Sequence, residues 1–244
     1  MTEPVTLLLL GGASFLAALI SASLSIGGGY VLFGATTLLY PLASAIALQP
    51  VLSYASLLGR AVAFRQAIAW QIVRPFTAGS LVGVAGGLAL YHALPERVLA
   101  LLVGIVMLVL TWTQLPLRRV HTTGGMAGVG VAHALSGTVL GMGSVLQPVL
   151  LHAGIARQAL VGTFATSLLA LAAIRTAGYA LTGFAYTSFI PAIAVATTTG
   201  VAGTALGKVL IGHVPEQGFR LTLRLLVTAL ALRLLWSAAV PGGN

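Results

Sequence analysis

The sequence lacks cysteine and aspartate, and its only acidic residues among 244 are Glu3, Glu96 and Glu216. Without cysteine the chain forms no disulfide and has no thiolate for catalysis or metal binding. Only 6% of the residues are charged, against about 25% in a soluble domain. The mean hydropathy is +1.05. This composition excludes a water-soluble globule and indicates an integral membrane protein.

Patterns that support catalysis are absent as well. The chain has no Walker A sequence, no His/Cys/Asp/Glu set with metal-ligand spacing, and no nucleophile with a base and an acidic third member. We therefore expect neither an enzyme nor a cofactor or metal site. The apolar spans contain no carboxylate, which argues against cation transport through a carboxylate relay and favours uncharged or anionic solutes.

The net charge is nevertheless +9, because the chain has 12 Lys and Arg residues and only three acidic residues. Basic loops on the cytoplasmic side of a membrane explain this balance better than a nucleic-acid partner does. A second, compatible interpretation is that the field inside the protein favours anions. The expected partners are the lipid bilayer and a small anionic substrate, with no nucleic acid, and a homodimer is left open.

The apolar runs predict an all-α polytopic membrane protein with eight to ten transmembrane or re-entrant helices. Prolines at the starts of three runs are expected to open helices. Two runs are short enough to re-enter the membrane rather than cross it. The expected segments are 5–26, 30–47, 51–70, 75–91, 95–115, 126–140, 145–153, 157–181, 189–211 and 215–239.

The two halves of the chain repeat one another. Glu96 and Glu216, each preceded by proline, lie 120 residues apart, as do Gly83 and Gly203. A second offset of 110 residues relates Ser53 to Thr163 and Arg65 to Arg175. Several matches at two steady offsets favour an internal duplication. The expected division is a first repeat over 1–115, a cytoplasmic linker over 116–125 and a second repeat over 126–244.

Loop charges suggest that these repeats are inverted. The loop with Arg65 and the linker with Arg118 are two spans apart and therefore share the cytoplasmic side. The loop around Pro95 is then outside, whereas its counterpart in the second half carries Lys208 and is expected inside. Inverted repeats around a midplane site are a common transporter plan. The expected location is the cell membrane, as a multi-pass protein of a bacterial inner membrane.

Two glycine-rich stretches interrupt the helices at comparable places in the two halves. Each glycine weakens a helix by about 1 kcal/mol relative to alanine. A broken helix is tolerated in lipid only where protein buries it or where it lines a polar cavity, so paired breaks indicate a transporter's binding site. Close helix packing is the alternative explanation. The candidate residues are Gly27, Gly28, Gly29, Gly141, Gly143 and Ser144.

Five polar side chains could complete such a site. Arg60 and Arg175 lie deep in spans without an acidic partner, so each could contact an anion or extend to a helix end. Gln147 could donate to the anion or bond a neighbouring helix. Ser53 and Thr163 could face the site or bond back to their own helices.

Other conspicuous residues are expected to be structural. His133 and His152 are the span histidines that could move protons, but a local hydrogen bond is the favoured role. The pairs Gly83/Gly87 and Gly203/Gly207 match the small-residue spacing of packed membrane helices.

Taken together, several stretches resemble the sulfite exporter TauE/SafE family, also described as 4-toluene-sulfonate-uptake-permease-like. These are Gly27–Gly29, residues 59–65 followed by Trp70, residues 94–96, Gly178–Tyr179, residues 203–208 and residues 220–235. The resemblance implies two related halves and transport of sulfur-containing anions such as sulfite and sulfonates. This sequence differs in having Gly143–Ser144 where the family has a fuller glycine run.

The sequence thus predicts a secondary transporter of small anions, organosulfur compounds foremost, with alternating access to a midplane site. Two alternatives stay open. One is a passive anion channel of the same architecture, and the other is a non-transporting membrane partner of another complex.

Overall fold

The computed structural model describes residues 3–24, 28–113, 122–143, 145–209 and 216–239. Within these ranges every regular element is a helix, which confirms the predicted all-α class. The elements in chain order are α1 Glu3–Leu24, α2 Gly28–Leu39, α3 Leu42–Leu52, α4 Tyr54–Ala63, the 3-10 helix η1 Arg65–Ala67, α5 Trp70–Ala93, α6 Glu96–Trp112, α7 Thr123–Leu140, α8 Leu146–Leu151, α9 Arg157–Leu181, the 3-10 helix η2 Tyr186–Phe189, α10 Ile190–Val209 and α11 Glu216–Ala239.

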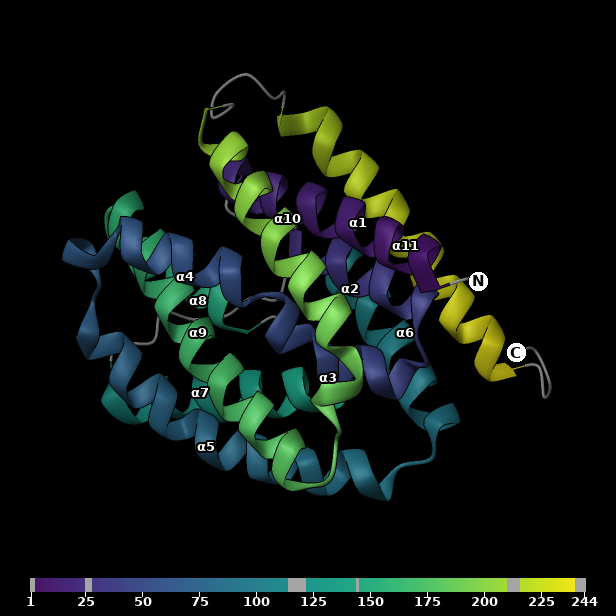
Figure 1. The fold of residues 1–244 in the computed structure, drawn as a ribbon. Helices are drawn as coiled ribbons and strands as arrows, with labels where there is room; N and C mark the ends of the chain where they lie inside the picture. The colour runs from purple at the N-terminus through teal and green to yellow at the C-terminus, as the bar shows by residue number, and fades with distance from the viewer. Residues whose placement is uncertain (1–2, 25–27, 114–121, 144, 210–215, 240–244) are drawn as a thin grey trace.

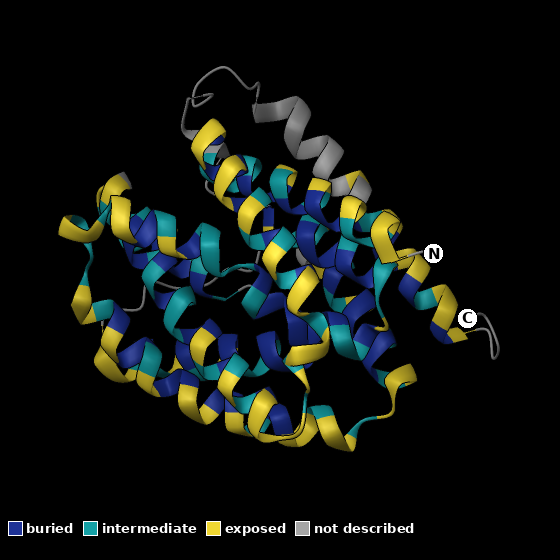
Figure 2. Ribbon diagram, in the orientation of Figure 1, coloured by how far each residue is buried: buried dark blue, intermediate teal, exposed yellow. Residues whose placement is uncertain are grey.

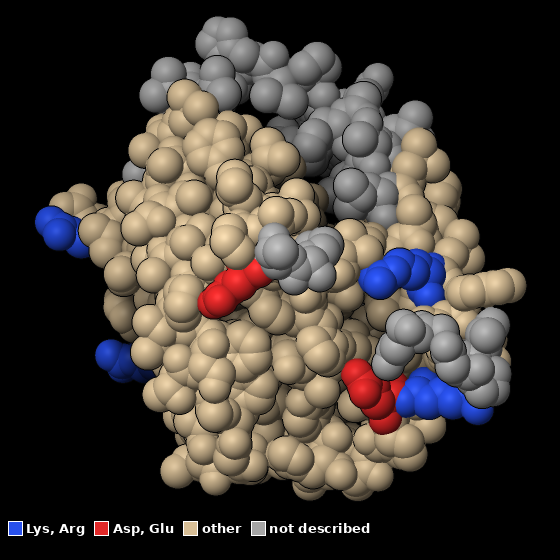
Figure 3. Space-filling view, turned by 45° about the vertical axis from the view of Figure 1, so that its right-hand side comes forward, with Lys and Arg blue, Asp and Glu red and all other residues tan. Residues whose placement is uncertain are grey.

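Five stretches of the described chain are long and apolar enough to cross a membrane. They are Glu3–Ala22, Leu42–Ala63, Trp70–Ala93, Gln158–Leu181 and Tyr186–Gly207. Their outward faces carry exposed apolar side chains, including Leu8 (76% exposed) and Leu181 (88%), as the outer surfaces in Figure 2 show. On the face in Figure 3 the charged side chains are scattered, and most of the described surface is uncharged. These features are those of a multi-pass membrane protein.

Two helix pairs form the outer layers of the fold. Helix α1 packs along α10, and α5 packs along α7. Helices α3, α4 and α9 lie between these two layers (Figure 1). Helix α6 packs against α11. Each layer therefore combines a helix from the first half of the chain with one from the second half.

Glycines allow the closest approaches within both layers. A Cβ at Gly83 would overlap the Val131 carbonyl oxygen of α7, and one at Gly87 would lie 2.7 Å from Thr138 Cβ. In the other layer, a Cβ at Gly207 would lie 2.6 Å from the Leu19 carbonyl oxygen of α1. Gly203 is equally close to α1. The structural role predicted for these glycines, close helix packing, is confirmed.

Two predicted helix boundaries are wrong. The sequence places a boundary at Gln49–Pro50, yet Pro50 lies inside α3 and the chain breaks earlier, at Tyr40–Pro41. Likewise Pro75 does not open a helix, because α5 already begins at Trp70. Proline is tolerated within a membrane helix where neighbouring groups satisfy the backbone that it leaves unpaired.

Candidate functional site

The two interruptions of the helices meet at one place. Helix α7 ends at Gly141, whose φ of 77° lies in the left-handed region that favours glycine. A side chain at Gly141 would overlap the ring of Phe33 in α2, the helix that follows the first interruption. Gly28, at the start of α2, packs just as closely on the Ala17 carbonyl oxygen of α1. The end of one break therefore contacts the helix that starts at the other.

Between the interruptions lies a cavity of about 160 Å³, enough for a small anion and a few water molecules. Its lining comes from both halves of the chain. Eight of the predicted site residues line it: Gly28, Gly29, Ser53, Arg60, Gly141, Gly143, Gln147 and Arg175. Two further candidates, Gly27 and Ser144, lie outside the described residues.

Thr163 is the described candidate that does not line this cavity. Its side chain is fully buried, and its hydroxyl accepts a hydrogen bond of 2.9 Å from the backbone N–H of Ala69. Thr163 thus joins α9 to the residue that precedes α5. Thr163 therefore lies outside the cavity lining, and within the described chain its hydroxyl makes no bond to its own helix.

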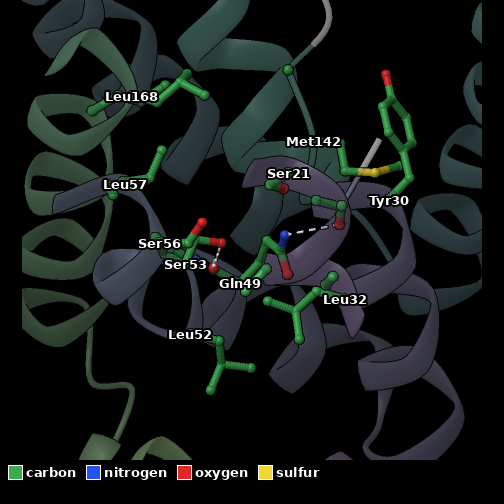
Figure 4. A pocket seen from close by; sticks show the side chains of 18 of the residues that line it. Ser21, Tyr30, Leu32, Gln49, Leu52, Ser53, Ser56, Leu57, Met142 and Leu168 are labelled. Atoms are coloured by element: carbon green, nitrogen blue, oxygen red, sulfur yellow. Dashed lines mark hydrogen bonds between the residues drawn. The ribbon is translucent and has the colours of Figure 1, made fainter. Parts of the chain in front are cut away.

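Ser53 combines both roles that the sequence left open. It lines the cavity, and its hydroxyl donates to the Gln49 carbonyl oxygen at 2.9 Å. In Figure 4 Ser53 and Ser56 lie side by side next to Gln49. These three residues form a polar strip at the junction between α3 and α4.

Arg175 of α9 lines the cavity and bonds to the backbone that the proline in α3 leaves unpaired. Pro50 has no N–H, so it cannot donate to the Ile46 carbonyl oxygen one turn earlier. Arg175 Nη2 donates to that oxygen instead, at 3.3 Å. The Tyr186 hydroxyl similarly donates to the Ala47 carbonyl oxygen at 2.9 Å. Helix α3 is thereby bonded to α9 and η2.

Several buried polar atoms on the cavity have no partner. Arg175 Nε, Gln49 Oε1 and Ser56 Oγ are buried without a hydrogen bond within the described chain. Gln49 Nε2 donates to the Gly29 carbonyl oxygen at 3.2 Å, a bond drawn in Figure 4. Buried polar groups are normally satisfied, so unpaired groups around a hollow indicate a ligand or water there.

The cavity carries positive charge, and the described residues that line it include no acid. Arg60 and Arg175 are only 8% and 5% exposed. Arg60 Nε donates to the Ser56 carbonyl oxygen at 3.2 Å, one turn earlier in its own helix. Glu3 and Glu96 stand at the first positions of α1 and α6, away from this lining. A buried cation without a counter-ion is costly, and an anion in the cavity would supply that counter-ion.

Sequence reasoning left out six polar residues that line the cavity: Ser14, Ser21, Tyr30, Gln49, Ser56 and His133. Gln49 stands beside Pro50, and polar residues next to a proline in an apolar run were a usable signal. The local bond expected for His133 is confirmed, since its Nδ1 accepts from the Leu146 N–H at 3.1 Å. His152 is exposed, and its Nδ1 lies 2.7 Å from the Pro148 carbonyl oxygen.

Comparison with known proteins identifies the family of this chain. Residues 10–234, nearly the whole chain, match the family described as Sulfite exporter TauE/SafE. Searches of curated proteins and of solved structures found no match. The match spans both helix layers and the cavity between them. The chain belongs to the sulfite exporter TauE/SafE family, a family of membrane transporters rather than enzymes.

Proposed function

We propose that this protein is a secondary transporter that moves small anions, organosulfur compounds such as sulfite and sulfonates foremost, across a bacterial inner membrane. The observation that carries the proposal is the pair of buried arginines on a cavity whose described lining contains no acidic residue. An anion there would be held by two guanidinium groups and by polar groups at the helix interruptions.

The geometry also supports two inverted repeats, residues 1–115 and 126–244, joined by the linker 116–125. Helix α1 of the first half pairs with α10 of the second, and α7 of the second pairs with α5 of the first. A two-fold relation between the halves produces such an exchange. The central pairs α6–α11 and α4–α9 join corresponding helices of the two halves, as the same relation requires.

This arrangement supports alternating access. The cavity lies between the layers α1–α10 and α5–α7, each of which is held together by close glycine contacts. Rocking of one tightly packed layer against the other would expose the central site to one side of the membrane and then to the other. The substrate-binding roles of the lining residues belong to this proposal.

The test is flux of sulfite and methanesulfonate in proteoliposomes that contain the purified chain. The wild type should show saturable uptake. Replacing Arg60 or Arg175 by Gln should lower apparent affinity by about tenfold or more, because a hydrogen bond to a charged group is lost. Arg74→Gln is the matched control, since Arg74 is exposed on α5 and does not line the cavity.

The alternatives predict different results. Flux that never saturates would indicate a passive anion channel. Folded protein that transports none of a panel of sulfite, sulfonates and dicarboxylates would favour a non-transporting membrane partner and would overturn the proposal.

A further inference from the structure

His133 is a buried polar residue on the cavity that the proposed binding set does not include. It lies in α7, is 2% exposed and lines the cavity together with Gly143 and Arg175. Its ring meets the ring of Phe76 edge to face, with the centroids 5.6 Å apart. The imidazole is therefore fixed in orientation by packing.

The hydrogen bond to Nδ1 fixes the position of the proton on this ring. The backbone N–H of Leu146, the first residue of α8, donates to Nδ1 at 3.1 Å. A backbone N–H can only donate, so Nδ1 must present its lone pair. The neutral ring then carries its hydrogen on Nε2. A doubly protonated ring would set two N–H groups against each other, so this contact also opposes a charged imidazole.

The Nε2–H group is unused and lies at the second interruption. It has no hydrogen-bond partner within the described part of the chain. A Cβ on Gly143 would overlap Nε2, so only glycine leaves this nitrogen uncovered. One turn beyond His133, a Cβ at Gly137 would lie 3.5 Å from the Gly143 N and 3.7 Å from Arg175 Nη1. The free donor and the guanidinium therefore share one small region.

We propose that His133 is a further anion-binding residue whose neutral Nε2–H donates to an oxygen of the anion held by Arg175. The inference rests on the proposed anion transport and adds an uncharged, directional donor to the two arginines. Arginine side chains can follow a moving anion, whereas a ring held at Nδ1 and packed on Phe76 cannot. His133 thus sets the position of one anion oxygen.

Two substitutions test the roles of the two ring nitrogens independently. In His133→Asn the side-chain oxygen can take the place of Nδ1 and accept from Leu146, but the Nε2 donor is gone. In His133→Gln the amide can reach the place of Nε2 and donate, but the acceptor for Leu146 is lost. The purified full-length chain is measured for sulfite binding by calorimetry under nitrogen and for thermal stability without ligand.

We expect His133→Asn to melt close to the wild type and to bind sulfite about tenfold more weakly or worse. His133→Gln should melt lower and keep most of the affinity. A merely structural histidine would give the same order of melting temperatures, but His133→Asn would then bind sulfite as tightly as the wild type. His133→Asn that binds sulfite as tightly as the wild type overturns the inference while leaving anion transport intact.

A second readout needs no ligand. Histidine ¹⁵N spectra of the wild type minus those of His133→Asn isolate the His133 signals from those of the other four histidines. An unprotonated Nδ1 and a protonated Nε2 are expected, and the reverse tautomer overturns the inference. If the wild type binds no anion at all, the proposed function fails, and this inference falls with it.

Discussion

At the scale of single residues, Thr163 marks the edge of the candidate site. Replacing it by Val removes the acceptor of the Ala69 N–H and leaves that part-buried donor without this partner. We expect a loss of about 1–3 kcal/mol in the free energy of unfolding. Sulfite affinity should not change, because Thr163 does not line the cavity. Thermal melting and sulfite titration of Thr163→Val check this, and a clear loss of affinity at unchanged stability would contradict it.

Some individual residues of the site could be predicted from the sequence, and others could not. Glycine runs and span arginines are rare in apolar helices, so Gly28, Gly143, Arg60 and Arg175 were recognisable from type and position alone. Their placement on one cavity agrees with the predicted grouping, and substrate binding by them stays a prediction. His133 could not be recognised, because its role depends on Leu146 and Gly143 across the second interruption.

At the scale of helices, alanine substitutions at two glycines of α5 are expected to change the stability of the protein in opposite directions. A Cβ at Gly79 would overlap the Ala127 carbonyl oxygen of α7, whereas one at Gly86 would sit 3.9 Å from Leu135 Cδ1. Gly79→Ala should therefore destabilise the protein by about 1–3 kcal/mol through overpacking. Gly86→Ala should stabilise it by up to about 1 kcal/mol through better helix propensity.

Chemical denaturation or thermal melting in one detergent compares the two variants directly. Equal effects of Gly79→Ala and Gly86→Ala would show that the α5–α7 contact does not depend on this close approach.

The helix pattern was easiest to predict where proline and glutamate mark helix starts. Helix α6 begins directly after Pro95, and α9 has the bounds expected from its apolar run. The region of α2 to α4 was predicted wrongly because a sequence shows that Pro50 lacks a donor but not that Arg175 satisfies the freed carbonyl. That bond joins residues 129 positions apart.

At the scale of the whole molecule, the inverted repeat makes a topological prediction. Gln66 in η1 and Thr182 after α9 are both exposed and stand at corresponding places in the two halves. Inversion places Gln66 on the cytoplasmic side and Thr182 outside. Because the chain has no cysteine, Gln66→Cys and Thr182→Cys each introduce a single thiol.

A membrane-impermeant maleimide added to intact cells should label Thr182→Cys and should label Gln66→Cys only after the cells are opened. Labelling of both from the same side would mean that the repeats are parallel or that the chain is not duplicated. The variants should retain sulfite flux, since neither residue lines the cavity.

The missing N–H of Pro50 has a consequence for the affinity with which Arg175 can bind an anion. Arg175 Nη2 donates to the Ile46 oxygen, which fixes one edge of the guanidinium. A guanidinium has five N–H donors, so the others can bind an anion while this bond stays in place. An arginine that is already ordered loses little side-chain entropy on binding, so the carbonyl freed by Pro50 should raise the affinity of Arg175 for an anion.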